Sequence, residues 1–547
     1  MSKPRSPLVF KFASEDWEFE LIHRLNYRTF VEEIPQHKAS PTHRLVDKFH
    51  PENTYLICLH DQKLVGMLAA RGNRPFSLDQ KIPDLDTHLP KGRTVCEIRL
   101  LAIDKNFRGA RGGQILSGLL ALLWQHGVER GYDLAIISGT MRQLRLYQHL
   151  GFVPFGPVVG TGDAQFQPMY VTLETFEMTA REFLRSAPAK SFQPSAANFL
   201  PGPVTVRREV RRAFEQAPES HRADSFKADF AATKQLLCKL VNATNVELLF
   251  GSGTLANDVI GAQLSLLPGR GLILSNGEFG ERLADHAQRL RLDFDHVRSD
   301  WGAALDMDAV RERLAGSDRP AWLWCAHCET STGVMNDLDT LKTLCAQTGV
   351  KLCLDCMSSI GTMPVDLGGV YLASCTSGKG LRSYPGIGMV FYSHNIRPEP
   401  DRLPRYLDLG YYAAQEGIPF TFSSNLLHAL HAAVRGVDWE RRFTQLDETS
   451  GWLRTTLTEA GFKLIGSQTV TSPAVVTIEL PPEIDSTVAG TLLKESGFLL
   501  SCNSDYLRGK NWIQICLMGE IAREKVVALT SALNRVLRKT EKVTNSR

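Results

Sequence analysis

The chain has 547 residues, of which 43% are hydrophobic and 22% are charged, a balance typical of globular proteins. Its formal net charge of +3 is close to neutral for this length, which argues against a nucleic-acid-binding surface or an anionic-membrane-binding surface. No apolar run reaches the length of a membrane span and the N-terminus turns acidic too early for a signal peptide, so we expect a cytoplasmic protein with more than one domain.

A segment rich in Ala, Ser and Pro, "SAPAKSFQPSAAN", has no apolar period and is typical of a linker. It predicts a first domain over residues 1–185, a linker over 186–197 and a second domain over 198–547. Both pieces have plausible sizes for domains or two-lobed units.

The N-terminal piece predicts an alternation of strands and helices. The strand "TVCEIRLLAID" leads through the turn "FRGARGG" into the amphipathic helix "QILSGLLALLWQHGVERG", and the strand "YDLAIISGT" and the helix "RQLRLYQHLGF" follow. Free N–H groups at such a turn, together with the helix dipole, favour an anion such as a pyrophosphate. The candidate ligands are Arg108, Gly112 and Gly113.

This order of elements, closed by "LRLYQHLGFVPFG", resembles the GNAT N-acetyltransferases over Asp16–Glu177. The opening "IHRLNYRTFVEE" is also similar to the branch that makes N-acyl amino acids and acyl-homoserine lactones. The resemblance implies acetyl-CoA or another acyl-CoA as donor, bound at the glycine turn, with Tyr147 near the thiol. Arg111 replaces the first glycine of the family's turn, which leaves the activity of this domain open.

Acyl transfer to an amine requires a base that removes a proton from the amine and an acid that protonates the leaving thiolate. Glu97, on the strand before the glycine turn, is the candidate base, and Tyr147 is the candidate acid. Glu32 and Glu33 are alternative bases. Glu97 is equally consistent with a simple ion pair to a neighbouring arginine.

In the second piece, strands such as "VELLFGSG", "RGLILSNG" and "VKLCLDC" alternate with helices, which predicts a mostly parallel sheet covered by helices on both faces. Two CxxC pairs, which start at Cys325 and Cys353, have the spacing of a zinc ribbon. They lie in apolar runs typical of buried strands rather than in polar turns, so we expect no metal site.

A cofactor-binding lysine is indicated by "TSGKGLRSYPGIG", where Lys379 stands between two glycines. A pyridine-based cofactor also needs a carboxylate for its ring nitrogen, which Asp355 offers at the end of an apolar strand. The strand-to-helix turn "FGSGTLAND" is a candidate phosphate site, and Phe279 is a candidate partner for the ring face. All lie where predicted parallel strands end, which is where open α/β sheets bind ligands.

The motifs "LPGPVTV", "GSGTLAND", "SNGEFGERL", "AHCETSTGV", "LDCMSSIGTMPVD" and "TSGKGLRSYPGIG" resemble the class V aminotransferases of fold type I, and above all the 2-aminoethylphosphonate–pyruvate and alanine–glyoxylate aminotransferases. The resemblance implies pyridoxal phosphate and a homodimer. It implies Lys379 as the catalytic lysine and the following further site residues: Ser252, Gly253, Thr254 and Ser377 at the phosphate, Phe279 and Asp355 at the ring, Glu329 and Thr330 beside it, and Thr421 across the dimer interface.

One departure from this family concerns the arginine that normally binds the substrate carboxylate. In "NWIQICLMG" its position holds Gln514, which lacks a charged bidentate fork. Arg382 is the preferred substitute, with Arg222 and Arg508 as alternatives; an ordinary salt bridge is an equally good explanation for each.

The sequence therefore predicts an aminotransferase for a small amino acid or aminophosphonate and a 2-oxo acid or aldehyde, fused to an acyl-CoA-dependent N-acyltransferase. A chemical reason for the fusion is an amine that is a substrate of both domains. Gln514 leaves a pyridoxal-phosphate lyase or decarboxylase as the alternative. A ligand sensor is disfavoured because the N-terminal piece offers no basic DNA-binding region.

Overall fold

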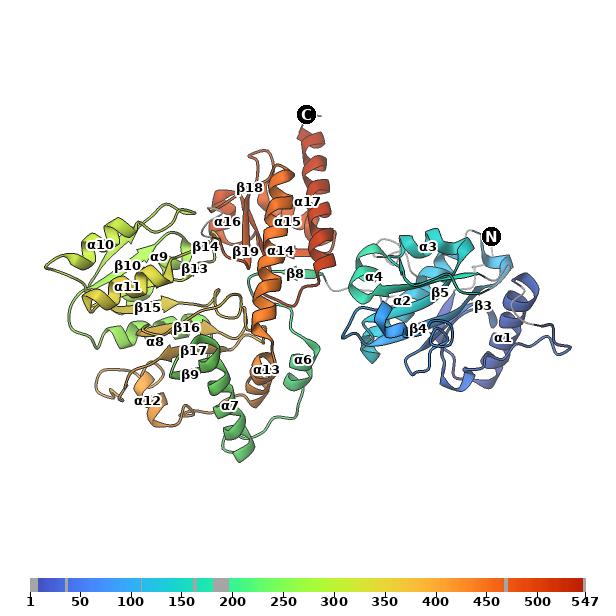
Figure 1. Ribbon diagram of the computed structural model, residues 1–547, viewed down its shortest axis with the longest axis horizontal. Helices are drawn as coiled ribbons and strands as arrows, with labels where there is room; N and C mark the ends of the chain where they lie inside the picture. The colour runs from blue at the N-terminus through green and yellow to red at the C-terminus, as the bar shows by residue number, and fades with distance from the viewer. Residues whose placement is uncertain are drawn as a thin grey trace, which may run out of the picture. The chain divides into compact units, whose positions relative to one another are not determined.

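The computed structural model describes residues 8–34, 38–109, 111–160, 165–180, 196–466 and 471–544. The chain divides into two compact units, Met1–Ser195 and Ala196–Arg547 (Figure 1). The predicted linker lies outside the described residues except at its end, where Ala197 already begins a strand.

The N-terminal unit is built on a seven-stranded sheet in the order β1-β2-β3-β4-β5-β7-β6, in which only the β4–β5 pair is parallel. Its elements are β1 (Val9–Phe12), α1 (Asp16–Tyr27), η1 (Arg28–Glu33), η2 (His50–Glu52), β2 (Thr54–His60), β3 (Lys63–Arg71), η3 (Leu85–His88), β4 (Val95–Ile103), η4 (Lys105–Phe107), α2 (Gly112–Arg130), β5 (Leu134–Thr140), η5 (Met141–Gln143), α3 (Leu144–His149), β6 (Val153–Pro154), β7 (Phe166–Thr172) and α4 (Leu173–Thr179).

Alternate residues of β2 enter different cores, because successive side chains of a strand point to opposite faces. Tyr55 and Ile57 pack with α1, whereas Leu56 and Cys58 pack with α2. The sheet is therefore covered on both faces.

Strand β4 is irregular in its middle. Leu100 has a left-handed backbone with φ of 55°, and the register with β3 shifts between Met67 and Ala69. The β4–β5 pairing also ends at the Ile98–Ile137 pair. Non-glycine residues in this region of φ/ψ space cost on the order of 1–3 kcal/mol and cluster at functional sites.

The C-terminal unit contains a seven-stranded sheet in the order β11-β10-β12-β15-β16-β17-β9, in which β17 alone runs opposite to the other six strands. This sheet and its helices comprise α6 (Arg208–Phe214), α7 (Asp224–Val241), β9 (Asn245–Phe250), α8 (Gly253–Leu264), β10 (Gly271–Ser275), α9 (Glu278–Arg289), β11 (Phe294–Arg298), α10 (Met307–Ala315), β12 (Trp322–Ala326), β13 (Cys328–Glu329), β14 (Val334–Met335), α11 (Leu338–Thr348), β15 (Lys351–Asp355), β16 (Leu372–Thr376), β17 (Ile387–Tyr392), α12 (Leu409–Ala414) and α13 (Ser424–Val434).

A smaller lobe completes this unit with an antiparallel β18-β19-β21 sheet and a parallel β20-β8 pair. Its elements are β8 (Ala197–Phe199), α14 (Trp439–Glu459), β18 (Lys463–Leu464), β19 (Val475–Glu479), α15 (Ser486–Glu495), β20 (Phe498–Leu500), α16 (Asp505–Lys510), β21 (Trp512–Cys516) and α17 (Arg523–Thr544).

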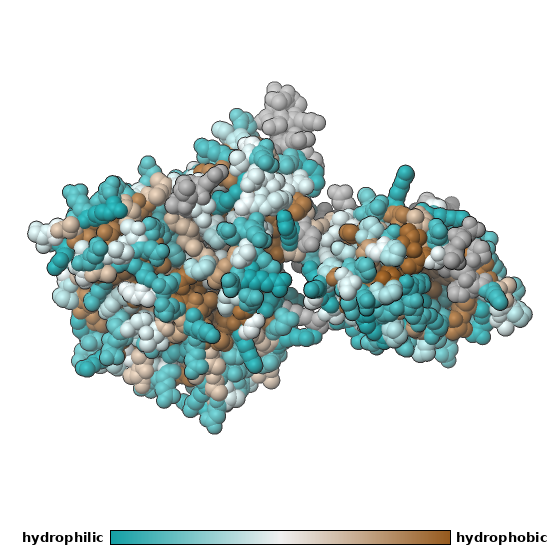
Figure 2. All heavy atoms as spheres, viewed as in Figure 1, coloured by the Kyte–Doolittle hydropathy of each residue, from teal (hydrophilic) through white to brown (hydrophobic). Residues whose placement is uncertain are grey.

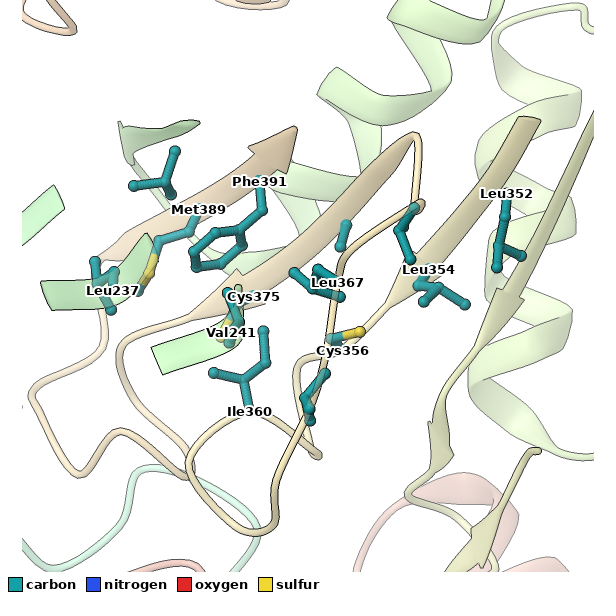
Figure 3. Packing of buried hydrophobic residues seen from close by; sticks show 14 of the residues in the cluster. Leu237, Val241, Leu352, Leu354, Cys356, Ile360, Leu367, Cys375, Met389 and Phe391 are labelled. Atoms are coloured by element: carbon teal, nitrogen blue, oxygen red, sulfur yellow. The ribbon is translucent and has the colours of Figure 1, made fainter. Parts of the chain in front are cut away.

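The large sheet is buried on both faces, which explains the near-continuous apolar strands. Leu352 and Leu354 of β15 join the cluster shown in Figure 3, together with side chains of α7 such as Leu237 and Val241. The intervening Cys353 packs with α8 and α9 on the opposite face. The predicted mixed α/β architecture with a mostly parallel large sheet is confirmed.

On the face shown in Figure 2, hydrophilic residues cover most of the surface of each unit, and hydrophobic residues form smaller patches among them. None of the helices in the described ranges is both long and apolar enough to cross a membrane.

Candidate active sites

A cavity of about 700 Å³ lies where strands β15 and β16 of the C-terminal unit end. Its walls include Gly253, Thr254, Phe279, Asp355 and Lys379. These residues come from four separate segments of the chain, which the sheet topology brings to one edge.

Lys379 follows β16 in a tightly packed turn. A Cβ atom at Gly380 would clash with the carbonyl oxygen of Ile360, and one at Gly378 would lie 2.9 Å from Pro385 Cβ. The two glycines therefore let the turn approach its neighbours closely. The Lys379 Nζ donates to Ser358 Oγ at 3.2 Å and lies 5.2 Å from the centroid of the Phe279 ring.

Asp355 ends β15, and its carboxylate is buried and held in place. Its Oδ1 accepts from the N–H of Met357 at 3.0 Å, and its Oδ2 accepts from Asn257 Nδ2 at 3.0 Å. The amide oxygen of Asn257 in turn accepts from Ser374 Oγ at 2.6 Å. Sequence reasoning missed Asn257, although a polar residue on the buried face of helix α8 was a usable signal.

Helix α8 presents its N-terminus to the cavity. Ser252 is the N-cap but its side chain makes no capping hydrogen bond, so the N–H groups of the first turn keep their capacity to bind an anion. Thr254 lines the cavity beside them. Ser377 does not, because its hydroxyl donates to the Tyr384 carbonyl at 2.7 Å and accepts from the Ile387 N–H at 3.2 Å.

Glu329 positions the segment that carries Phe279. It is fully buried, and its carboxylate accepts from the N–H groups of Phe279 at 3.2 Å and Gly280 at 2.9 Å. Burial raises the pKa of Glu329. Neither Glu329 nor Thr330 lines the cavity; the Thr330 hydroxyl lies 2.5 Å from Ser358 Oγ, the partner of the lysine.

Both polar atoms of the Gln514 amide are hydrogen-bonded to other parts of the protein. Its Nε2 donates to the carbonyl oxygens of Thr330 at 2.7 Å and Ser331 at 2.9 Å and to Thr477 Oγ1 at 2.9 Å. Its Oε1 accepts from the Tyr506 hydroxyl at 3.1 Å. Gln514 therefore fastens β21 to the 330–331 loop and does not line the cavity.

None of the three arginines proposed from the sequence lines this cavity in the described part of the unit. Arg382 is buried and paired with Glu520, Arg508 pairs with Asp505, and Arg222 is exposed. The arginines that do line it are Arg282 and Arg289 of α9, which sequence reasoning missed. Thr421 is exposed and lies outside the lining of its own chain's cavity.

The two CxxC pairs lie in and beside adjacent strands of the large sheet. Cys325 of β12 and Cys353 of β15 are fully buried, and burial raises the pKa of both thiols. Within the described ranges, no group of three or more His, Cys, Asp or Glu side chains is placed to bind a metal ion.

A second cavity of about 700 Å³ lies in the N-terminal unit, where β4 and β5 part. It is lined by residues of β4 after the last β4–β5 pair, by Ser138 and Thr140 of β5, and by Tyr147 of α3. Burial raises the pKa of Tyr147. Glu97, the predicted base, lines the same cavity as Tyr147, the predicted acid.

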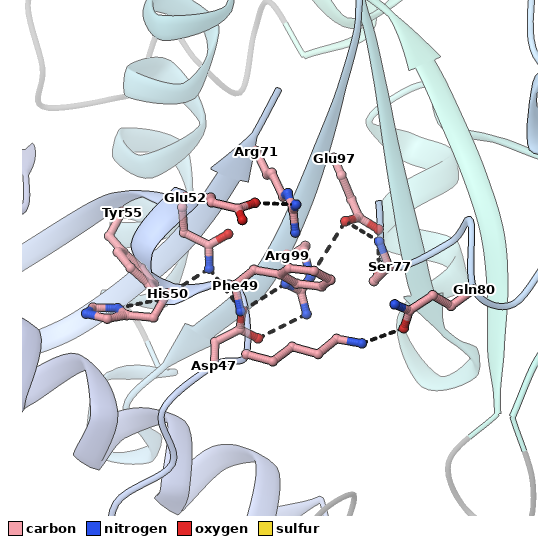
Figure 4. Close-up of polar contacts among 12 residues, drawn as sticks. Asp47, Phe49, His50, Glu52, Tyr55, Arg71, Ser77, Gln80, Glu97 and Arg99 are labelled. Atoms are coloured by element: carbon pink, nitrogen blue, oxygen red, sulfur yellow. Dashed lines mark hydrogen bonds and ion pairs between the residues drawn. The ribbon is translucent and has the colours of Figure 1, made fainter. Parts of the chain in front are cut away.

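Glu97 is almost completely buried and strongly hydrogen-bonded (Figure 4). Its carboxylate accepts from the Ser77 N–H at 2.8 Å, the Ser77 hydroxyl at 2.5 Å and the Leu78 N–H at 3.2 Å. The alternative bases lie outside the cavity lining, since Glu32 is exposed and Glu33 pairs with Arg108 at 2.6 Å.

The glycine turn begins helix α2 at Gly112, with Arg111 as N-cap. Both arginines of the turn have partners within the protein. Arg108 forms an ion pair with Glu33, and the guanidinium of Arg111 forms a hydrogen bond with His60 Nε2 at 3.0 Å. The space beside Gly113 is open, because an added Cβ would meet nothing within 4 Å. The turn does not line the cavity that holds Glu97.

Comparisons with known proteins find one family match in each unit. Residues 211–403 match the family described as aminotransferase class-V, and residues 21–169 match the family described as N-acyl amino acid synthase FeeM. The C-terminal unit contains a class V aminotransferase domain. The N-terminal unit contains a domain that is similar to the N-acyl amino acid synthases of the FeeM family, which supports an acyltransferase domain.

Relatives of known name cover the class V domain nearly end to end. The soluble hydrogenase 42 kDa subunit of Anabaena cylindrica is 28% identical over 357 residues, 62% of this chain and 92% of that protein. The 2-aminoethylphosphonate–pyruvate transaminase of Pseudomonas fluorescens is 25% identical over 62% of this chain and 96% of its own. The crystal structure of alanine–glyoxylate aminotransferase from Nostoc sp. superposes with a TM-score of 0.58 and 28% identity, over 64% of this chain and 97% of its own.

The class V aminotransferase domain implies pyridoxal phosphate as cofactor, and the cavity of the C-terminal unit fits that group. An uncapped helix N-terminus suits its phosphate, a buried carboxylate suits its ring nitrogen, and a lysine amine is at hand for its aldehyde. The protein is thus an enzyme that fuses an aminotransferase to an acyltransferase.

Proposed function

We propose that the C-terminal unit transfers an amino group from a small amino acid or aminophosphonate to a 2-oxo acid or aldehyde, with Lys379 as its catalytic residue. The observation that carries this proposal is the convergence of Lys379, Asp355 and the start of α8 on one cavity. Pyridoxal phosphate, when bound, supplies an electron sink for the bond broken at the substrate carbon.

The residues around this cavity then have distinct tasks. Gly253 and Thr254 would hold the phosphate, Asp355 the ring nitrogen and Phe279 the ring face. The amine of Lys379, which is hydrogen-bonded to Ser358, would remove the proton from the substrate carbon in one half-reaction and return a proton to the carbon of the oxo acceptor in the other.

A half-reaction tests this proposal. The holoenzyme is mixed with single donors (alanine, glutamate, aspartate, 2-aminoethylphosphonate or taurine), and the absorbance of the bound cofactor and the oxo product are measured. We expect one donor to yield its oxo product and the amino form of the cofactor in equal amounts. The Lys379→Ala variant should still bind that donor but yield neither product.

A lyase or decarboxylase is the second candidate, because the amide of Gln514 is bound to the 330–331 loop and the arginines that line the cavity, Arg282 and Arg289, come from helix α9 instead. Release of a cleaved or decarboxylated product without the amino form of the cofactor would favour this candidate over transamination.

For the N-terminal unit we propose acyl transfer from an acyl-CoA to a primary amine, with Glu97 as base and Tyr147 as acid. The shared cavity of these two residues supports the assignment. Release of CoA that depends on an added amine tests this assignment. The Glu97→Gln variant should lower the amine-dependent rate about 100-fold, since general-base catalysis contributes on the order of 100- to 10,000-fold.

Eleven free thiols support our assignment of the enzyme to the cytoplasm.

A further inference from the structure

A further cavity, of about 730 Å³, lies in the C-terminal unit and shares no lining residue with the cofactor cavity. It is formed by the C-terminal half of α7, the start of α11, the loop 363–366 and the start of α14. Apolar side chains make up most of its lining, among them Leu236, Leu240, Met335 and Met363. The proposed amino transfer assigns no task to this cavity.

Two aromatic side chains of α14 line one part of this cavity. Trp439 and Phe443 lie one helical turn apart, and their ring centroids are separated by 5.9 Å. Both side chains are only partly buried. They therefore offer apolar surface that a flat molecule would remove from water.

His327 is a buried polar side chain of the same lining with free hydrogen-bonding capacity. It is 5% exposed, and burial lowers its pKa to about 4, so its ring is neutral near pH 7. Its Nδ1 lies 3.0 Å from Ser359 Oγ, which donates to the Cys356 carbonyl at 3.3 Å. Nδ1 therefore carries the proton, and Nε2 keeps its lone pair. No residue in the described part of the chain is hydrogen-bonded to this Nε2.

The other polar groups of the cavity do not select a ligand. The amide of Asn336 is used inside the protein: its nitrogen donates to the Ala326 carbonyl at 2.7 Å, and its oxygen accepts from Asn276 Nδ2 at 2.9 Å. The charged side chains of the lining are exposed to solvent, where a charge needs no counter-ion. These are Lys239, Asp337, Asp339 and Asp366.

We propose that this cavity binds a small neutral aromatic molecule with one hydroxyl or ring N–H group, such as a phenol or an indole. The ring of the ligand packs against Trp439 and Phe443, and its hydroxyl or N–H group donates to Nε2 of His327. A charged ligand is disfavoured, because burying an ion against apolar side chains without a buried counter-charge is costly. The site is independent of both proposed reactions.

Titration calorimetry with the full-length holoenzyme tests the proposal. The probes are para-cresol and para-methylanisole, which have the same ring, but the methyl ether has no proton to donate. Wild type should bind para-cresol about tenfold more tightly, the size of one hydrogen bond to a buried acceptor. His327→Phe keeps an aromatic ring but has no nitrogen acceptor, and it should bind the two probes with equal affinity.

Phe443→Ala is a second variant, which removes apolar contact area and leaves the buried hydrogen bonds of His327 intact. It should weaken the binding of both probes by a similar factor, roughly 3- to 10-fold. Gln445→Ala is the matched control, because Gln445 is exposed on the same helix outside the cavity lining, and its affinities should equal those of wild type.

Several outcomes would overturn the proposal. Equal affinity of wild type for the two probes would show that Nε2 of His327 does not accept from the ligand, and so would a preference for para-cresol that His327→Phe retains. Unchanged affinities in Phe443→Ala would place the bound probes in a different cavity. If His327→Phe does not fold, the probe comparison in wild type and in Phe443→Ala still decides between these results.

Discussion

Gln514 stands where the resemblance to the class V aminotransferases implies a carboxylate-binding arginine. Its Nε2 serves three acceptors, of which two are backbone carbonyls at 2.7 and 2.9 Å. A buried amide with this pattern can be replaced only by another donor. Gln514 therefore has a structural role in this chain. An anionic group of the substrate would have to bind another cation, and the arginines that line the cavity are Arg282 and Arg289.

The variant Gln514→Glu tests this interpretation. It keeps the size of the side chain but turns a carboxylate oxygen toward two carbonyl oxygens and Thr477 Oγ1, so three buried acceptors lose their donor. We expect the free energy of unfolding to fall by about 2–4 kcal/mol, measured by urea denaturation. Gln288→Glu, on the exposed side of α9, is the control and should change it by less than about 0.5 kcal/mol. A Gln514→Glu variant as stable as wild type would contradict the assignment.

His327 makes stability depend on pH. Burial lowers its pKa to about 4, and its Nδ1 lies 3.0 Å from Ser359 Oγ. An unfolded histidine has a pKa of about 6.5. Between these two values the unfolded chain binds a proton that the folded chain does not, so the free energy of unfolding decreases as the pH falls from about 6.5 to about 4.

The largest slope expected from this one residue is about 1.4 kcal/mol per pH unit. Urea denaturation at pH 7, 6 and 5 measures it, and His327→Gln should show a shallower loss of stability with acid than wild type. Identical slopes for the two proteins would show that the imidazole of His327 is not the titrating group.

Helix α8 is the element that links the two ends of the cofactor site. Its N-terminus faces the cavity, and one turn later Asn257 holds Asp355, a residue 98 positions away in the chain. The helix would therefore position both the residues that bind the phosphate of the cofactor and the carboxylate that binds its ring nitrogen. The placement of α8 then sets the distance between these two binding sites.

Asn257→Ala should weaken pyridoxal phosphate binding while leaving the fold intact. The carboxylate of Asp355 loses one of its two hydrogen bonds, and we expect the dissociation constant of the cofactor to rise about tenfold, measured by fluorescence titration of the apoprotein. Ser374→Ala removes only the partner of the Asn257 oxygen and should have a smaller effect. An unchanged affinity for pyridoxal phosphate in Asn257→Ala would show that the hydrogen bond from Asn257 is not needed to position Asp355.

At the scale of the whole molecule, the two units have separate hydrophobic cores. Each cluster of buried apolar residues draws all its members from one unit. We therefore expect Met1–Ser195 and Ala196–Arg547 to fold when produced separately, each with a single cooperative thermal transition. Aggregation of either fragment, together with one shared transition in the full chain, would contradict this expectation.

We also propose that the class V domain forms a homodimer in which Thr421 completes the partner's phosphate site. Mixing Lys379→Ala subunits with Thr421→Ala subunits should then produce heterodimers. In each heterodimer, one of the two active sites keeps both the native Lys379 and the native Thr421. We expect the mixture to be more active than either variant alone, and light scattering should show a dimer. Additive activities of the two variants would place Thr421 outside the site.

The sequence by itself determined the features that are local in the chain. Three such features are the glycines around Lys379, the acid at the end of an apolar strand and the small residues at the start of α8. Each can be recognised within a few residues, because backbone geometry restricts which residues fit such turns. The same reasoning predicted the mostly parallel sheet, since strands buried on both faces must be apolar throughout.

Only the tertiary structure decided which side chains meet. The side-chain partner of Asp355 and the partners of Gln514 and Glu97 come from other segments, and no local pattern indicates that Arg382 pairs with Glu520. Whether a charged group binds a ligand or a neighbour depends on distances of a few ångströms between elements. Those distances are set by the packing of the whole domain rather than by the residues next to it in the chain.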